Sequence, residues 1–295
     1  MAESFSSKLR LWEGWNPPRG QGLSPPANAL PPPRRDPTGA AERLFAEETL
    51  RRVHSDRDGA EPFSLQWFLG AEAVRHNRQG RWIPHLLEFG KHAGEKLLGL
   101  GRGLGTDWVQ YARLGADVTA CCPSAEGLSL VQRNFELRNL PGRFLHADPA
   151  AIPLAASSID VVCVSQLLED APDPATIVEE IYRVLKPGGK VLAVAPARYD
   201  VDYWCRHLLP WERLLRSGKD RADPAPRGFS ARRLRRLFGC FVEHRVHKRH
   251  LRRAEIPHLW RWLPLPLLER LFGRFLVLKA FKPLSAAIPT PLAAA

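Results

Sequence analysis

Three glycines stand where a buried strand gives way to a helix. The run KLLGLG (96–101) predicts a short apolar strand, and Gly101, Gly103 and Gly105 precede a helix expected over 105–114. Glycine at such a turn lets the backbone bend tightly and approach a ligand closely. A dinucleotide pyrophosphate favours the spacing G-x-G-x-x-G, so the spacing G-x-G-x-G makes a nicotinamide-dependent oxidoreductase the less favoured reading of this turn.

Strands and helices alternate after this turn. Further strands are expected at 116–122, 143–147, 159–165, 190–197, 241–248 and 274–282. Ser124 and Asp173 are good N-caps for helices between them, and the run KPGG (186–189) is a stop signal for the second helix. This order predicts an α/β fold, a doubly wound, seven-stranded, mostly parallel sheet with helices on both faces. Ligands of such sheets bind beyond the carboxyl ends of the strands.

Three ordered stretches within about residues 90–200 resemble the class I S-adenosylmethionine-dependent methyltransferases, especially the small-molecule type-11 group. They are KLLGLGRGLGTDWVQYARLGADVTACCPS, HADPAAIPLAASSIDVVCVSQLLEDAPD and IVEEIYRVLKPGGKV. The tail LRRLFGCF…RFLVLKAFKP is similar to that group's last helix and antiparallel strands. The resemblance implies the Rossmann-like methyltransferase fold, S-adenosyl-L-methionine as cofactor, and methyl transfer. The family's substrates are diverse, so a small-molecule, lipid or glycan acceptor stays open.

The resemblance also implies a set of cofactor contacts at the carboxyl ends of the strands. They are Gly101, Gly103, Gly105, Asp107, Cys122, Pro123, Asp148, Pro149, Ser165, Gln166 and Leu167. The glycines would lie under the methionine part, and Asp107 would start the next helix. Asp148 would hydrogen-bond the adenine amino group. Residues 165–167 would line the reactive end of the cofactor.

Two positions depart from the family's pattern. The acid usually found two residues before the first glycine is Gly99 here, and Cys122 replaces the acid that holds the ribose hydroxyls. A charge-assisted hydrogen bond contributes about 1.5–3 kcal/mol, and losing a bidentate ribose contact lowers affinity by up to roughly 100-fold. The alternative is therefore a catalytically inactive, methyltransferase-like binding or scaffold protein. Glu126 is a candidate replacement for the missing charge.

Methyl transfer from a sulfonium is an in-line displacement that depends mainly on orientation and exclusion of water. An oxygen acceptor also needs a base, and the candidates are Glu169, Asp170 and His207. Glu169 and Asp170 occupy positions where relatives often carry histidines, and solvated caps of the next helix are the alternative role for both. No metal site is expected, because His244 and His247 would point to opposite faces of a strand.

The net charge is +12, and the window from Cys205 to Arg253 holds 15 Lys/Arg against 4 Asp/Glu. Such a window suits an anionic substrate or surface, or it is simply a solvated face. Nucleic acid is not expected, because RRM and zinc-finger patterns are absent and SQLLEDAP lacks the Asn/Asp-Pro-Pro-aromatic motif of base methylation. The run PHLWRWLPLPLLERLF leaves a substrate lid and a peripheral membrane contact open. The oligomeric state is not indicated.

Composition indicates a reduced, cytoplasmic protein, since there is no 18-residue apolar run, no secretory leader and no C-x-x-C pair among five cysteines. Amphipathic helices are expected over 40–53 and 64–76. The expected parts are a flexible proline-rich arm (1–40), a helical cap (41–90), a Rossmann-like cofactor-binding core (91–200), a basic C-terminal part that completes the sheet and carries the Trp/Leu/Pro-rich insertion (201–284), and a disordered tail (285–295).

Overall fold

The computed structural model describes residues 61, 63–201, 203–204, 228–251, 260 and 262–284. The proposed arm (1–40), the helix expected over 40–53 and the tail (285–295) lie outside these residues. The division of the chain at 40, 90, 200 and 284 stays a prediction. No helix among the described residues is both long and apolar enough to cross a membrane.

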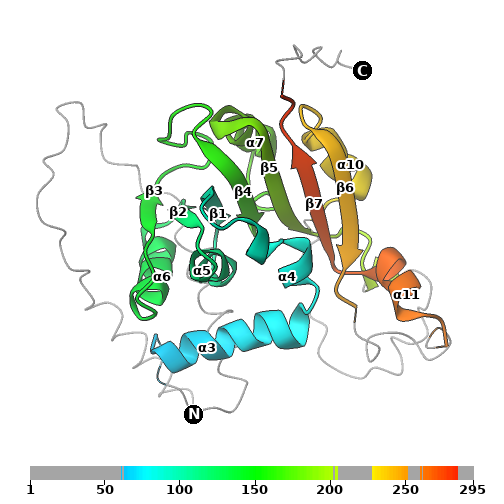
Figure 1. Ribbon diagram of the computed structural model, residues 1–295. Helices are drawn as coiled ribbons and strands as arrows, with labels where there is room; N and C mark the ends of the chain where they lie inside the picture. Colours follow the sequence, from blue (N-terminus) through cyan, green and yellow to red (C-terminus); the bar gives the residue numbers. More distant parts are fainter. Residues whose placement is uncertain are drawn as a thin grey trace, which may run out of the picture. The chain divides into compact units, whose positions relative to one another are not determined.

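The described strands form one sheet in the order β3-β2-β1-β4-β5-β7-β6 (Figure 1). They are β1 (Lys96–Gly101), β2 (Asp117–Cys122), β3 (Arg143–His146), β4 (Ile159–Ser165), β5 (Leu185–Pro196), β6 (Val242–Arg249) and β7 (Phe275–Phe281). Only β7 runs against its neighbours, pairing antiparallel with both β5 and β6. The predicted seven-stranded, mostly parallel α/β sheet is confirmed.

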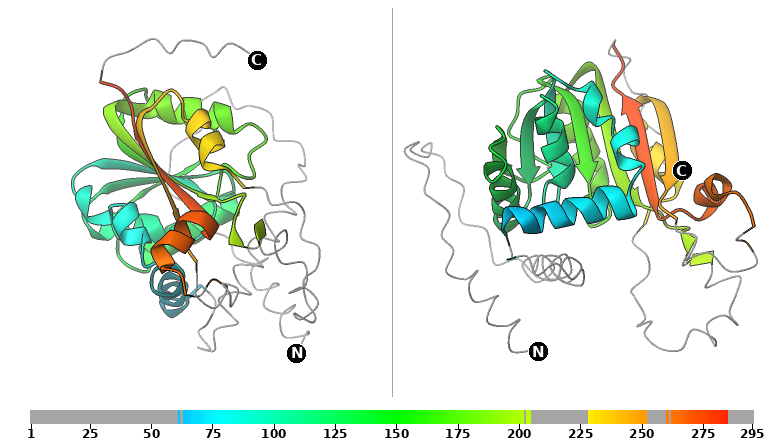
Figure 2. Two further views of the ribbon diagram at one scale, coloured as in Figure 1. Left: turned by 90° about the vertical axis from the view of Figure 1, so that its right-hand side faces the viewer. Right: turned by 60° about the horizontal axis from the view of Figure 1, so that its bottom comes forward.

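Helices cover both faces of this sheet (Figure 2). They are α3 (Leu65–Ala73), the π-helix η1 (Val74–Gln79), α4 (Ile83–Leu86), the 3-10 helix η2 (Phe89–Lys91), α5 (Thr106–Arg113), α6 (Ala125–Glu136), α7 (Pro174–Val184), α10 (Ala231–Leu237) and α11 (Leu265–Phe272). Ser124 and Asp173 cap α6 and α7 as predicted, because their side chains accept from the backbone N–H groups of Gly127 and Ala175.

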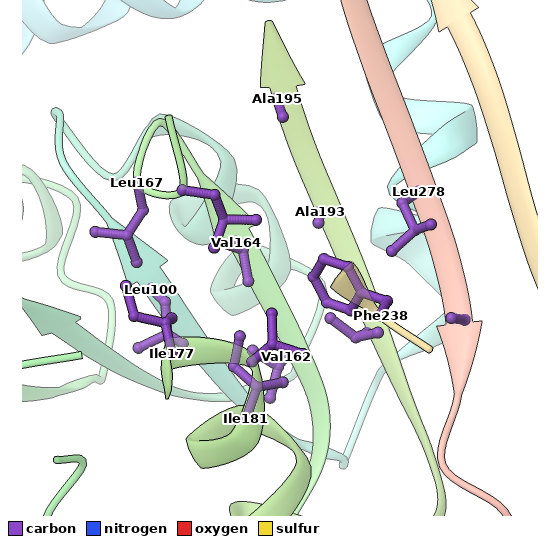
Figure 3. Packing of buried hydrophobic residues seen from close by; sticks show 14 of the residues in the cluster. Leu100, Val162, Val164, Leu167, Ile177, Ile181, Ala193, Ala195, Phe238 and Leu278 are labelled. Carbon is purple, nitrogen blue, oxygen red and sulfur yellow. The ribbon is translucent and has the colours of Figure 1, made fainter. Parts of the chain in front are cut away.

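The apolar residues of the strands alternate between two cores. On one face, Val162 and Val164 of β4 pack with Ile177 and Ile181 of α7 and with Phe238 after α10 (Figure 3). On the other face, α5 and α6 cover the opposite side chains of β1, β2 and β4. Burial on both faces explains why most residues of these strands are apolar.

The start of β5 differs from prediction. The sequence places a stop at 186–189 and a strand from 190, whereas α7 ends at Val184 and β5 begins at Leu185. Leu185 pairs with Ile159, and the register then shifts before Val161 pairs with Lys190. Gly188 has a φ of +77°, in the left-handed region that favours glycine. The KPGG run is therefore the irregular beginning of the strand rather than a separate turn.

Helix α3, the first of the described helices, lies across the edge where the parallel strands end (Figure 1). Trp67, Phe68 and Ala71 of α3 are buried in one cluster with Leu104, which belongs to the glycine turn after β1. Ser64 caps the helix by accepting from the Trp67 N–H at 3.3 Å. This packing covers one side of the turn that the sequence singled out.

Candidate active site

The glycine turn after β1 has the geometry its sequence implied. A Cβ on Gly101 would lie 2.1 Å from the carbonyl oxygen of Ser165, the last residue of β4. Gly103 has a φ of +129°, and a Cβ there would meet only Gln166 Oε1, at 3.4 Å. Gly101 is thus required for the approach of two strands, whereas Gly103 leaves bare backbone facing Gln166. A bare backbone of this kind is where a ligand approaches closely.

The segment after β4 faces this turn. Gln166 adopts a φ of +53°, a left-handed conformation that a non-glycine residue adopts at an energetic cost. Ser165 is buried, and the side chain of Leu167 packs in the hydrophobic core (Figure 3). Of the three residues proposed to line the reactive end, Leu167 can offer only its backbone.

Asp107 in the first turn of α5 is buried in an ion-pair cluster. Arg75 donates from Nε to Asp107 Oδ1 at 2.7 Å and from its terminal nitrogen to Oδ2, and His76 Nε2 lies 3.0 Å from Oδ1. Burial raises the pKa of Asp107, but the charge and hydrogen bonds of Arg75 outweigh burial and hold that pKa well below its usual range. Arg75 Nη2 also reaches Ser165 Oγ at 3.3 Å. Asp107 thus holds η1 against the start of α5, directly after the glycine turn.

No pattern in the sequence pointed to Arg75 and His76 as residues of the site. They belong to the π-helix η1 and are 32 and 31 residues from Asp107 in the chain. The sequence feature that could have indicated them is Asp107 itself, because a carboxylate in the first turn of a buried helix needs a basic partner from another part of the chain.

The missing acid of β1 is replaced by an aromatic ring. A Cβ on Gly99 would lie 2.5 Å from Cε2 of Trp108, whose side chain is 3% exposed. The indole ring therefore occupies the space in which a longer side chain at position 99 would start.

The second missing acid leaves no charge at the end of β2. Cys122 is 1% exposed, and burial raises the pKa of its thiol to about 12. Pro123 follows it and accepts from His146 through its carbonyl at 3.2 Å. Glu126 is exposed in the first turn of α6, immediately after this strand end.

The proposed adenine contact is exposed to solvent. Asp148 follows β3, and its Oδ1 accepts from the Ala150 N–H at 2.9 Å, which fixes the turn. Pro149 beside it is buried. The second carboxylate oxygen of Asp148 is left for other partners, as an exposed acceptor at the carboxyl edge.

Glu169, on the loop after β4, carries a carboxyl group with a raised pKa. Burial raises the pKa of Glu169 to about 7, with the charge of Asp170 adding to the rise and that of Arg102 opposing it. Arg102, from the glycine turn, pairs with Asp170 at 3.3 Å. His207, the third candidate base, lies outside the described residues. Among the residues that the structure describes, no group of three His, Cys, Asp or Glu side chains could hold a metal ion.

Two buried polar atoms at this place lack a hydrogen-bond partner among the described residues. They are Glu169 Oε2 and Arg102 Nε. An orphaned buried acceptor and donor on the two loops that flank Gly103 are polar groups to which a ligand can bond. Beside Gly103, the described residues therefore leave one acceptor and one donor without a partner.

The comparisons with known proteins agree with this geometry. Residues 97–193 match a family model described as "Methyltransferase domain", of type 11. This segment belongs to the class I S-adenosylmethionine-dependent methyltransferases. The methyltransferase domain thus spans β1 to β5 and includes the glycine turn and the loop with Glu169, and S-adenosyl-L-methionine is the cofactor of this family. This identity displaces the nicotinamide-dependent reading.

Two curated relatives illustrate the similarity of the methyltransferase domain. The chain is 32% identical over 168 residues to the ubiquinone biosynthesis O-methyltransferase of Psychrobacter arcticus, covering 49% of this chain and 65% of the relative. It is 38% identical over 104 residues to the demethylmenaquinone methyltransferase of Clavibacter sepedonicus, covering 34% of this chain and 40% of the relative. The chain therefore spans less than two thirds of the length of either relative.

Solved structures share the fold at low identity. A SAM-dependent methyltransferase from Aquifex aeolicus has a TM-score of 0.51 at 15% identity, covering 74% of this chain and 98% of its own. The cyclase SpnF has a TM-score of 0.55 at 17% identity, covering 83% of this chain and 96% of its own. SpnF is named a [4+2]-cyclase, so a protein with this fold is not necessarily a methyltransferase. The fold alone therefore does not establish the reaction, which depends on the residues of the site.

Proposed function

We propose that this protein transfers a methyl group from S-adenosyl-L-methionine to an oxygen atom of a small-molecule acceptor. The observation that carries the proposal is the pair of orphaned polar atoms, Glu169 Oε2 and Arg102 Nε, on the two loops beside the open backbone of Gly103. The family of the domain supplies the cofactor class. The names of the two relatives, which concern ubiquinone and menaquinone, favour a hydroxylated aromatic acceptor of the quinone-precursor type.

In this proposal, one set of residues binds the cofactor and Glu169 removes a proton from the acceptor. When bound, the cofactor supplies a methyl group on a positively charged sulfur. The backbone at Gly103, with Gln166 opposite, supports the methionine part, and Asp148 offers an acceptor to the adenine amino group. Arg75 is placed by Asp107 beside Ser165, where its cationic group favours a carboxylate.

Glu169 acts as the base in this proposal. Its carboxylate takes the proton of the acceptor hydroxyl while the oxygen forms a bond to the methyl carbon, and the carbon–sulfur bond breaks to leave a neutral thioether. A pKa of about 7 suits this role, because the ionised form is present at neutral pH and still binds a proton well. Asp170 keeps Arg102 in position.

Calorimetric titration of the full chain with S-adenosylmethionine and with its demethylated product tests the proposal. We expect saturable heat with a Kd below about 1 mM and a higher Tm for the complex, because a ligand that binds only the folded state stabilises it. NADH is the matched negative ligand. No heat from either nucleoside at millimolar concentration would rule out the enzyme assignment.

Glu126 is proposed to replace the charge that Cys122 lacks. Glu126→Gln should raise the Kd for the cofactor roughly tenfold, because a carboxylate that accepts from ribose hydroxyls becomes a neutral amide. Glu136→Gln is the matched control, since Glu136 ends the same helix and bonds Gln132 at 2.8 Å. Equal Kd values for both variants, measured by the same titration, would exclude Glu126.

A non-catalytic role is the second candidate. It is favoured by the ring of Trp108 in the place of the β1 acid and by the un-ionised thiol of Cys122. Incubation with the methyl-labelled cofactor and a panel of hydroxylated aromatics separates the two functions. Binding of the cofactor without any labelled product would favour a scaffold.

We further propose a cytoplasmic location and an anionic acceptor or surface for the basic window. Cys121, Cys122, Cys163 and Cys240 carry free thiols, as expected in a reducing compartment. The four arginines of α10 are exposed, and they are Arg232, Arg233, Arg235 and Arg236. The part of the window from 205 to 227 lies outside the described residues.

A further inference from the structure

The short helix α11 has apolar side chains on two sides. Its inner side is part of the body of the protein, because Leu268 is 1% exposed and clusters with Val201 and Leu251. On its outer side, Leu267 and Leu271 are 48% and 51% exposed, and Trp262 just before the helix is 79% exposed. Large apolar side chains gathered on one exposed helix face mark an interaction surface.

The orientation of α11 is fixed by basic residues of β6. Lys248 Nζ donates to the carbonyl oxygen of Leu271 at 2.6 Å, and also to that of Tyr199. Arg249 pairs with Glu269 of the helix at 3.6 Å. These contacts on the inner face and at the C-terminal end of α11 fix the helix so that its outer face points to solvent.

The helix lies at the same edge of the sheet as the glycine turn. The strand that follows it, β7, begins at Phe275, which pairs with Pro196 at the carboxyl end of β5. Figure 1 shows α11 beside this end of β6 and β7, at the edge that α3 crosses farther along. A partner bound to the outer face of α11 would therefore face the edge that holds the candidate active site.

Charge indicates which partner this face suits. Arg270 is exposed on the same side as Leu267 and Leu271, three and one residues away. The chain from 248 to 274 contains seven Lys/Arg against two Asp/Glu. Helices that lie in the interface of an anionic bilayer typically combine leucine and tryptophan side chains, which enter the lipid, with arginines, which bind the headgroups.

A second copy of the chain fits this face less well. A two-fold interface would bring Arg270 of one copy close to Arg270 of the other, and like charges repel. An anionic lipid surface instead neutralises them. We propose that the outer face of α11, formed by Trp262, Leu267, Arg270 and Leu271, docks on an anionic lipid bilayer.

Docking in this way turns the carboxyl edge of the sheet toward the membrane. If the acceptor is an apolar aromatic molecule, it can then pass from the lipid to the site without crossing water. This last step rests on the proposed function, whereas the docking itself does not.

Vesicle co-sedimentation of the full chain tests the apolar part of the surface. Vesicles of phosphatidylcholine with phosphatidylglycerol should retain the protein, and Leu267→Gln/Leu271→Gln should lower the partition coefficient at least about tenfold. Leu114→Gln is the matched control, because Leu114 is 48% exposed at the end of α5 and should bind like the parent. Equal retention of the double variant and the parent overturns the proposal.

The charged part is tested by Arg270→Glu against Arg236→Glu. The first should lower binding to anionic vesicles about fivefold or more and leave the weak binding to pure phosphatidylcholine unchanged. If Arg236→Glu has the larger effect, α10 is the docking site and the proposal fails. If light scattering shows a dimer that Leu267→Gln/Leu271→Gln converts to a monomer, the face is a contact between copies and the proposal also fails. Cofactor titration of the same variants should match the parent, so that loss of lipid binding is separable from failure of the proposed activity.

Discussion

Glu169→Gln should lower kcat for an oxygen acceptor by about 100-fold or more, the range expected when a general base is removed. The amide keeps the size of the side chain but cannot take the proton of the acceptor hydroxyl. Because the base is active when ionised, the rate of the parent should rise with pH through about 7, the pKa to which burial raises Glu169. The variant should lose this rise. Initial rates with labelled cofactor across pH 5.5–9 measure both effects.

Glu169→Gln should lower activity but raise stability, and the gain in stability can be measured without a methyl acceptor. A carboxyl whose pKa is raised on folding holds its proton more tightly in the folded state, so stability is lost as pH rises from about 4.5 through 7. Glu169→Gln removes this loss and should stabilise the protein at pH 8.5 by on the order of 2 kcal/mol, with little change at pH 4.5. Thermal unfolding at the two values measures the difference.

Glu179→Gln is the control for both measurements, because Glu179 is exposed on α7. A loss of stability in Glu169→Gln at pH 8.5, together with an unchanged pH profile of the rate, would assign the carboxylate to the fold alone. Loss of activity combined with gain of stability is typical of a group kept for function.

The order of strands and helices could be predicted because its signals are local. Runs such as 159–165 are apolar except for Asp160 and Ser165, and Ser124 and Asp173 mark helix starts within three residues of the groups they cap. The boundary before β5 could not, because the pairing of Leu185 with Ile159 is a tertiary contact that outweighs a local stop signal. Strand pairing here decides where a helix ends.

The sequence predicted where the candidate site lies in the fold, but not which side chains surround its unusual residues. Glycine spacing located the turn, and the order of motifs located Asp148 and Glu169. The partners of Asp107 come from η1, more than thirty residues earlier, and no periodicity links such distant positions. The sequence likewise showed that position 99 lacks an acid, but only the packed structure shows what occupies that space.

Gly99→Glu should destabilise the protein by at least about 4 kcal/mol rather than restore cofactor binding. The Cβ would start 2.5 Å from the ring of Trp108, which is 3% exposed, so the ring must move. Overpacking of a core costs about 1–3 kcal/mol, and a buried carboxylate without a partner costs several more. Since a domain has only about 5–15 kcal/mol of stability, much of the chain should be unfolded or insoluble. Urea unfolding followed by circular dichroism measures the loss.

The control and a second variant separate steric clash from charge. Gly90→Glu places the same side chain where nothing lies within 4 Å of the Cβ, and it should unfold like the parent. Adding Trp108→Ala to Gly99→Glu opens the space that the ring fills, so the two changes together should cost less than the sum of their separate effects. A Gly99→Glu protein as stable as Gly90→Glu would show that the ring yields readily, and position 99 would then be open to the acid that the family usually carries.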